Sequence, residues 1–239
     1  MSKNFILLFT IFLFFSCKKD VELLSFSEVE ITTKNNTLVE VFVPKALGKT
    51  PVSATINTTI ENFIASLITS GTAENNDKLL SVTNQIELFN QEYQSFNKEF
   101  PKAIQNWEAQ IHGEVTFKSS KMISIVLTSY INTGGVHGNT SINFLNFDAI
   151  TGKKISKEAL LTDVKGFKTI AKSYFEKETL EESTIIASSD FKLPENIGFS
   201  EDGIILLYNT YETLPYTKDI IEFTIPFEIA NDYLVFDSF

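Results

Sequence analysis

The side chains best suited to chemistry are few in this chain of 239 residues. There is one cysteine, Cys17, and there are two histidines, His112 and His137. A single cysteine permits neither an intramolecular disulfide nor a cysteine-based zinc cluster. The two histidines could flank one metal site only if their strands pair, and a hydrolytic zinc site would need a carboxylate such as Asp148 as well. Nothing in the spacing supports that third ligand.

Motifs for covalent catalysis or phosphate binding are also missing from the sequence. It contains no GxSxG, no GxGxxG and no GxxxxGK[ST] segment. Paired carboxylates occur at Glu181-Glu182 and Glu201-Asp202. They fall at a predicted helix end and a predicted turn, where solvated charge is the ordinary interpretation. We therefore expect no cofactor and no metal, and we predict that the protein is not an enzyme.

A glycine-rich string is the most unusual local feature. Three glycines within five positions allow positive φ and a close approach of the backbone to another group. His137 in this string could act as an acid or base, bind a metal or sense pH. Alternatively, His137 pins the loop by hydrogen bonds while the glycines permit a tight crossing between strands. The candidate binding residues here are Tyr130, Thr133, Gly134, Gly135, His137, Gly138 and Asn139.

A second string places three tyrosines within nine positions, beside Pro215. Tyrosine combines an apolar ring with a polar hydroxyl, which suits contact with saccharides or proteins. The same residues also suit a half-buried strand and turn, so both interpretations stay open. The candidate binding residues are Tyr208, Tyr211, Glu212 and Tyr216.

The single cysteine follows an N-terminal targeting pattern. The apolar run 5–15 is too short for a membrane-spanning helix, which needs about 20 residues, but it suits the hydrophobic region of a signal peptide. Ser16 before Cys17 resembles the lipobox of bacterial lipoproteins. The resemblance implies removal of residues 1–16, acylation of Cys17 and a tether over 17–25. It also implies a lipid-anchored protein of the bacterial envelope, which we assign to the outer membrane with its leaflet left open.

The charge of the chain narrows the choice of partners. Thirty acidic residues outnumber 20 basic ones, all of them lysine, and the formal net charge is −10 at pH 7. This balance argues against nucleic acid and anionic lipid as main partners, and the absence of arginine removes the planar group that usually binds phosphate. A basic partner fits, because opposite charge increases association rate and specificity.

Hydrophobic periodicity predicts the elements that position these strings. Two strands are expected within 22–43, followed by helices over apolar stripes at 56–67 and 79–100, the second ended by Pro101. The second stripe favours packing on a sheet over a coiled-coil seam, because it lasts only about three heptads. Strands are then expected from Trp107 to Phe117, with every second residue on one face, and at 122–131 and 142–150.

The remainder of the chain repeats this mixture of helix and strand. A helix is expected around 167–175, a hairpin at Glu201-Asp202-Gly203, a strand at 221–225 and a short helix beginning at Pro226. The succession predicts an α+β fold with antiparallel sheets packed against helices, in two small consecutive units.

Several strings together resemble a bacterial family. Tyr130 with Thr133-Gly134-Gly135-Val136-His137-Gly138-Asn139 is similar to the Y-x-x-TGGAHG signature of the RsiV-like domain (domain of unknown function 3298). The resemblance continues at Phe147-Asp148, Thr151-Gly152-Lys153, Asp202-Gly203-Ile204, Tyr208-Asn209, Tyr211-Glu212, Pro215-Tyr216 and Ile225-Pro226. Upstream, Val43-Pro44 and Ile56-Asn57 resemble a PdaC-type domain (domain of unknown function 4163).

The resemblance implies a PdaC-type α+β domain at 26–135 and an RsiV-like α+β domain at 136–239. Such domains occur in membrane- or wall-attached proteins, including a lysozyme-binding anti-sigma factor and an accessory region of a peptidoglycan deacetylase. It carries over no catalytic residue, and the deacetylase's Asp-Asp and His-x₃-His motifs do not occur here.

These observations lead to one functional prediction and two alternatives. We predict a non-catalytic, lipid-anchored envelope module that binds peptidoglycan or a cationic protein such as lysozyme through the two candidate strings. One alternative is a structural or assembly lipoprotein. The other is a peptidoglycan-directed deacetylase or hydrolase that uses His137 with a nearby carboxylate.

Overall fold

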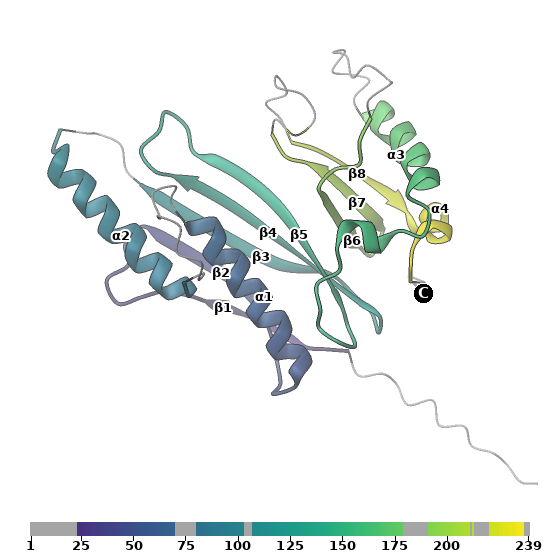
Figure 1. Cartoon of the computed structure of the whole chain (residues 1–239), viewed down its shortest axis with the longest axis horizontal. Helices are drawn as coiled ribbons and strands as arrows, with labels where there is room; N and C mark the ends of the chain where they lie inside the picture. The colour runs from purple at the N-terminus through teal and green to yellow at the C-terminus, as the bar shows by residue number, and fades with distance from the viewer. Residues whose placement is uncertain are drawn as a thin grey trace, which may run out of the picture.

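The structure, a computed structural model, describes residues 23–69, 80–102, 107–178, 191–210, 212 and 220–236. The predicted signal peptide and Cys17 lie outside these residues. Figure 1 shows a larger sheet with two long helices at one end of the molecule and a smaller sheet with its own helices at the other. The predicted α+β class is confirmed.

The larger sheet has five strands in the order β1-β2-β3-β4-β5. Neighbouring strands are antiparallel except β2 and β3, which run parallel because two helices connect them. The strands are β1 (Phe26–Glu30), β2 (Val39–Ala46), β3 (Glu108–Lys118), β4 (Met122–Asn132) and β5 (Asn139–Asp148).

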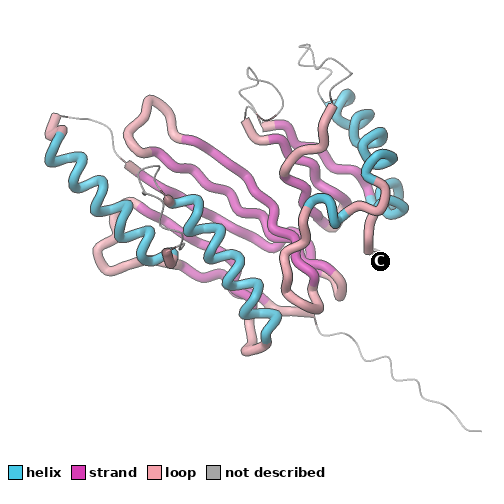
Figure 2. The backbone as a smooth tube through the Cα atoms, viewed as in Figure 1, coloured by secondary structure: helices cyan, strands magenta, loops and turns pink. Residues whose placement is uncertain are grey.

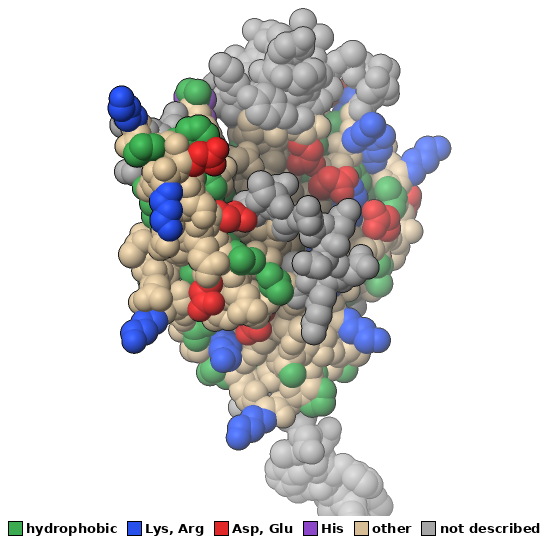
Figure 3. Space-filling view, turned by 60° about the vertical axis from the view of Figure 1, so that its left-hand side comes forward, with side chains coloured by type: hydrophobic (Ala, Val, Ile, Leu, Met, Phe, Trp, Pro, Cys, Tyr) green, Lys and Arg blue, Asp and Glu red, His purple; other side chains and the backbone are tan. Residues whose placement is uncertain are grey.

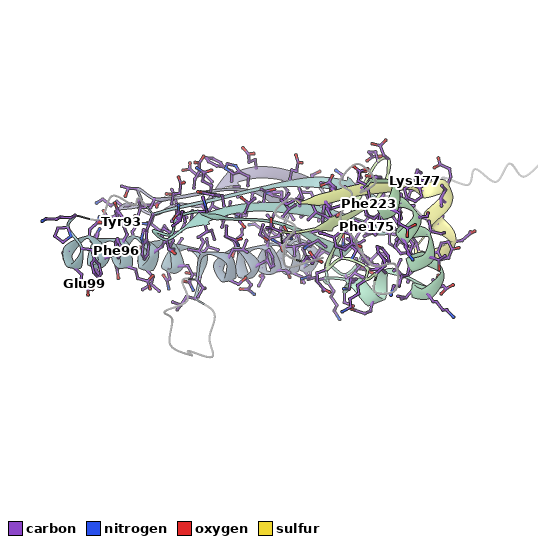
Figure 4. All side chains as sticks on the ribbon, turned by 90° about the horizontal axis from the view of Figure 1, so that it is seen from above. Tyr93, Phe96, Glu99, Phe175, Lys177 and Phe223 are labelled. Atoms are coloured by element: carbon purple, nitrogen blue, oxygen red, sulfur yellow. The ribbon has the colours of Figure 1, made fainter. Side chains whose placement is uncertain are left out.

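Helices α1 (Pro51–Ile68) and α2 (Val82–Glu99) cover one face of this sheet (Figures 2 and 4). The predicted stripe of α1 buries Ile56, Ile60 and Ile64 against the strands. Thr50 and Ser53 form a capping box that satisfies free backbone N–H groups at the start of α1. The sequence therefore specifies both where α1 begins and which of its sides is buried.

The stripe of α2 also packs on the sheet, as its pattern predicts. Ile86 and Phe89 are buried in the first core. Further along, Tyr93 and Phe96 lie 6.1 and 5.7 Å from the Trp107 ring, measured between ring centroids (Figure 4). The stripe is thus a packing surface rather than a seam for a second chain.

The smaller sheet contains β6 (Asn196–Ser200), β7 (Gly203–Tyr208) and β8 (Ile221–Pro226) in that order. Helix α3 (Val164–Glu178) packs on it and contributes Phe175, whose ring centroid lies 6.1 Å from that of Phe223 (Figure 4). Short helices η1 (Lys157–Leu160), α4 (Phe227–Ala230) and η2 (Asn231–Tyr233) complete this part. The predicted hairpin at Glu201-Asp202-Gly203 and the short helix after Pro226 are both confirmed.

The predicted alternation along β3 is wrong at one residue. The pairing register shifts between Val115 and Phe117, so one extra residue forms a β-bulge. Because strand side chains alternate with a period of two, the bulge turns Phe117 to the opposite face from Val115. Val115 packs on the first core, whereas Phe117 belongs to the second and lies 5.6 Å from the Phe227 ring.

The expected domain boundary does not divide two sheets. Residues 135 and 136 lie in the loop between β4 and β5. Strand β5, which follows that loop, pairs with β4 from Ile131 opposite Asn139 to Met122 opposite Asp148. The first strand after the boundary therefore completes the sheet of the first unit.

None of the helices in the described ranges is long and apolar enough to cross a bilayer.

Candidate binding surface

The glycine-rich string forms the loop that joins β4 to β5. Gly134 has a φ of +89°, and its N–H donates to Oδ1 of Asn132 at 2.9 Å. The ring of Tyr130 lies over Gly138 so closely that a Cβ at this glycine would be 2.3 Å from Cζ of the tyrosine. The close approach expected for this string is therefore made to the protein's own Tyr130. Gly135 is freer, since the nearest atom to a Cβ there is 3.4 Å away.

The tip of the loop is exposed. Val136 has 88% of its surface accessible, and Thr133 and His137 are exposed as well. In the part of the chain that the structure describes, the side chain that accepts a hydrogen bond from the loop backbone is Asn132, bonded to the N–H of Gly134, and not His137. The loop thus presents an apolar residue and an imidazole at the end of a long hairpin.

The two histidines and Asp148 do not meet. His112 lies in the middle of β3, opposite Thr128, with its ring stacked on Phe42 at 5.8 Å between centroids. Asp148 ends β5 and accepts hydrogen bonds from the turn that follows, including one from the N–H of Thr151 at 2.7 Å. Over the described ranges, no three His, Cys, Asp or Glu side chains are grouped as a metal ion would require.

Asp148 stabilises the turn after β5 by accepting hydrogen bonds from it. Burial opposes ionisation of its carboxyl, but hydrogen bonds from Thr151 and Ile150, with the charge of Lys153, outweigh that effect and lower its pKa. The Thr151-Gly152-Lys153 segment is thus held by a charged acceptor, and Gly152 there has a φ of +71°.

The tyrosine string is only partly described, because Tyr211 and Tyr216 lie outside the described residues. Tyr208 is buried, and its hydroxyl donates to the carbonyl of Lys192 at 2.8 Å. Burial, and then the charge of Glu212, raise the pKa of this hydroxyl. Glu212 accepts from the backbone N–H of Asn209 at 2.9 Å. The buried Tyr208 and the half-buried Glu212 therefore hold the end of β7 together.

Asn209, which sequence reasoning missed, connects the two strings. Its Oδ1 accepts from the N–H of Ile142, and its Nδ2 donates to the carbonyl of the same residue, both at 2.8 Å. Ile142 lies on β5, three residues after Asn139, so the β4–β5 hairpin is fixed to the end of β7 near its loop. Figure 1 shows the loop and the end of β7 at the same, upper end of the molecule. Asn209 was part of the strings that resemble the family, but nothing in its sequence context indicated a contact with Ile142.

Further asparagines close the outer edge of β5. Asn196 accepts from the N–H of Phe144 at 3.3 Å, while the N–H of Ile155 donates to the carbonyl of Asn146 at 2.8 Å. An open strand edge offers unpaired backbone groups to another chain. Here side chains and a neighbouring segment occupy those groups, so this edge is not a free template for strand addition.

The smaller sheet covers one end of the face that points away from α1 and α2. The N–H of Phe199 donates to Oγ of Ser124 at 3.2 Å, and Nδ2 of Asn146 donates to the carbonyl of Ile197 at 2.7 Å. The ring of Phe144 fills the space over Gly198. Toward the β4–β5 loop, none of the described helices lies on this face (Figure 4).

A cleft of about 510 Å³ lies where α1, β5 and β6 meet. Its wall combines the Phe63 ring with the amides of Asn143 and Asn196. Nζ of Lys154 lies 5.7 Å from the centre of the Phe63 ring, and Lys157 forms an ion pair with Glu195. Amide groups beside an aromatic ring can bind a polar ligand such as a sugar.

The fold and these contacts define a two-sheet α+β protein whose sheets are joined by a bulged strand and asparagine side chains. Residues 31–140 match the family model described as "Deacetylase PdaC", and residues 137–228 match the model described as "Protein of unknown function (DUF3298)". The two matches follow one another along the chain in the predicted order. These families are associated with the cell envelope, and their function is unknown.

Solved structures show the same fold. A DUF3298 family protein from Pseudomonas aeruginosa is 17% identical, covers 90% of this chain and 96% of its own, and superposes with a TM-score of 0.62. A DUF3298 family member from Bacteroides fragilis is 18% identical, with 90% and 94% covered and a TM-score of 0.60. No curated protein sequence matches the chain.

Proposed function

We propose that this chain is a non-catalytic, lipid-anchored module of the bacterial envelope that binds peptidoglycan or a basic protein such as lysozyme. The observation that carries the proposal is the β4–β5 loop, where Val136 is 88% exposed at the tip of a hairpin that Asn209 holds at Ile142, near the loop. An exposed apolar side chain on a fixed support suits a contact with another molecule, because little conformational entropy is lost on binding.

Binding of peptidoglycan is supported by the cleft between α1, β5 and β6. Its amides and the Phe63 ring provide the mixture of polar and aromatic groups that a sugar requires. Binding of a basic protein is supported by the net charge of −10, because opposite charge increases the association rate. Acylation of Cys17 would keep the module at the membrane, since each buried methylene of an acyl chain contributes about 0.8 kcal/mol.

Binding to lysozyme and to purified muropeptides tests the proposal with the full-length protein in detergent. We expect Val136→Asp to lower affinity at least about tenfold, because a charge replaces the exposed apolar contact. Ile150→Asp is the matched control, since Ile150 is also 73% exposed but lies in the turn at the far end of β5. Absence of binding to both ligands, or an equal loss in the two variants, would refute the proposed contact.

The anchor and the enzymatic alternative have separate tests. Cys17→Ser is expected to abolish metabolic labelling with a palmitate analogue and to release the protein from membranes. Turnover of peptidoglycan that is lost in His137→Ala would establish the hydrolase or deacetylase alternative instead.

A further inference from the structure

The strand register defines a continuous open face on the larger sheet. Residues paired across strands point to the same side, so one row runs across all five strands from β1 to β5. That row contains Glu30, Phe42, His112, Thr128 and Ile142. A flanking row contains Glu40, Gln110, Tyr130 and Thr140, and on the other side lie Glu28, Glu114, Val126 and Phe144. We call this surface the open face.

The charge of the open face has one sign. Four of its side chains are exposed glutamates, and no lysine occupies any of the positions in these rows. On the side of the molecule that Figure 3 shows, most lysine side chains stand apart from one another. The exposed glutamates of the open face are Glu28, Glu30, Glu40 and Glu114.

Aromatic and apolar groups lie among these carboxylates. Phe42 and Tyr130 are half-buried, and the Phe42 ring stacks on the imidazole of His112. Val126 and Ile142 are also half-buried, whereas the ring of Phe144 lies against Gly198 of the smaller sheet at the covered end of this face. The glutamates thus lie on β1, β2 and β3, and apart from Phe42 these apolar and aromatic residues lie beside them on β4 and β5. Aromatic residues are enriched in protein interfaces, which have a polar rim. Guanidinium or ammonium groups of a partner can also lie over the accessible part of the Phe42 ring.

We propose that the open face docks a basic polypeptide surface, rich in lysine or arginine. This inference rests on the proposed function and adds to it the contact surface and the chemistry of the partner. Charge complementarity selects this occupant, because a second copy of a chain with net charge −10 would bring like charges together. A neutral glycan would leave the carboxylates of the open face without counter-charges.

The test compares two triple variants with the same change in net charge. The face variant is Glu30→Gln, Glu40→Gln and Glu114→Gln. The control variant changes three exposed glutamates of the helices on the other side of the sheet, Glu61→Gln, Glu87→Gln and Glu99→Gln. Hexalysine is the probe, and its binding to the full-length protein is measured by calorimetry at low and at physiological salt.

We expect the face variant to bind hexalysine about tenfold more weakly and the control variant to change affinity less than about twofold. The salt dependence of binding should decrease in the face variant alone. Equal losses in the two variants would mean that only the overall charge attracts the peptide, and they would overturn the inference. Failure of the wild-type protein to bind hexalysine, or dimers in sedimentation that the face variant abolishes, would overturn it too.

The two proposals can fail separately. Loss of lysozyme and muropeptide binding in Val136→Asp with no difference between the triple variants would leave the proposed function standing and remove the open face as the contact. Wild-type protein that binds neither lysozyme nor muropeptides would refute the proposed function itself.

Discussion

Removing the Asn209 side chain tests how the two sheets are joined. In Asn209→Ala, the N–H and the carbonyl of Ile142 both lose a hydrogen bond of 2.8 Å. Each such bond contributes about 1 kcal/mol net, and the partly buried site allows water to replace some of the loss. We therefore expect the free energy of unfolding to fall by about 2 kcal/mol. Asn209→Asp retains the acceptor but not the donor, and should lose about half as much.

Urea denaturation followed by tryptophan fluorescence measures this change. Trp107 is the only tryptophan, and it lies 5.5 Å from the Phe89 ring in the first core. With a denaturant slope of about 2 kcal/mol per molar urea, the expected loss moves the midpoint by about 1 M. Gln94→Ala is the control, because it removes an exposed amide from α2. A loss below about 0.5 kcal/mol in Asn209→Ala would refute the view that this side chain joins the sheets.

Three further predictions concern single residues. Gly138→Ala should destabilise the protein by about 1–3 kcal/mol because its Cβ would collide with the ring of Tyr130, whereas Gly135→Ala should be nearly neutral; thermal denaturation compares them. Tyr208→Phe should cost about 1 kcal/mol at pH 7, because it removes the buried hydroxyl and leaves the carbonyl of Lys192 without this donor. Since the folded-state pKa of Tyr208 is raised, the wild-type protein should lose stability above pH 10 more steeply than this variant. Asp148→Asn should be destabilising at pH 7, because the lowered folded-state pKa stabilises the protein above the ordinary value of 3.8. This contribution of the carboxylate should be lost as the pH falls through the folded-state pKa, and unfolding at several pH values measures the loss.

Each of these expectations has an outcome that contradicts it. Equal melting temperatures for the Gly138 and Gly135 variants would mean that the tyrosine ring moves aside at no cost. Parallel alkaline unfolding curves for Tyr208→Phe and wild type would place that hydroxyl in water. A difference between Asp148→Asn and wild type that does not change with pH would show that the charge of Asp148 contributes nothing.

Local features of the fold follow from neighbouring residues. The stripe at Ile56, Ile60 and Ile64 predicts the buried side of α1, because helical periodicity depends only on positions a few residues apart. Pro101 and Pro226 predict where one helix ends and another begins for the same reason. The family resemblance, which rests on contiguous strings, was confirmed by both matches.

The candidate site was predicted less completely. Both strings were found from their unusual composition, but composition does not distinguish a side chain that faces a ligand from one that holds its own loop. Tyr130 lies over Gly138, and Tyr208 donates to a backbone carbonyl, so both tyrosines make contacts within the protein itself. His137 and Val136 remain exposed at the tip, where the prediction of a binding role applies.

The sequence by itself determined the helices, the turns and the glycine loop, since each depends on forces between near neighbours in the chain. Only the tertiary structure decided that β5 joins the first sheet, that the bulge before Phe117 turns its ring into the second core, and that Asn209 bonds to Ile142 67 residues away. Strand partners are selected by burial and backbone hydrogen bonding across such separations, and periodicity along one strand cannot specify them. The open face has the same origin, because its rows exist only once five strands are in register.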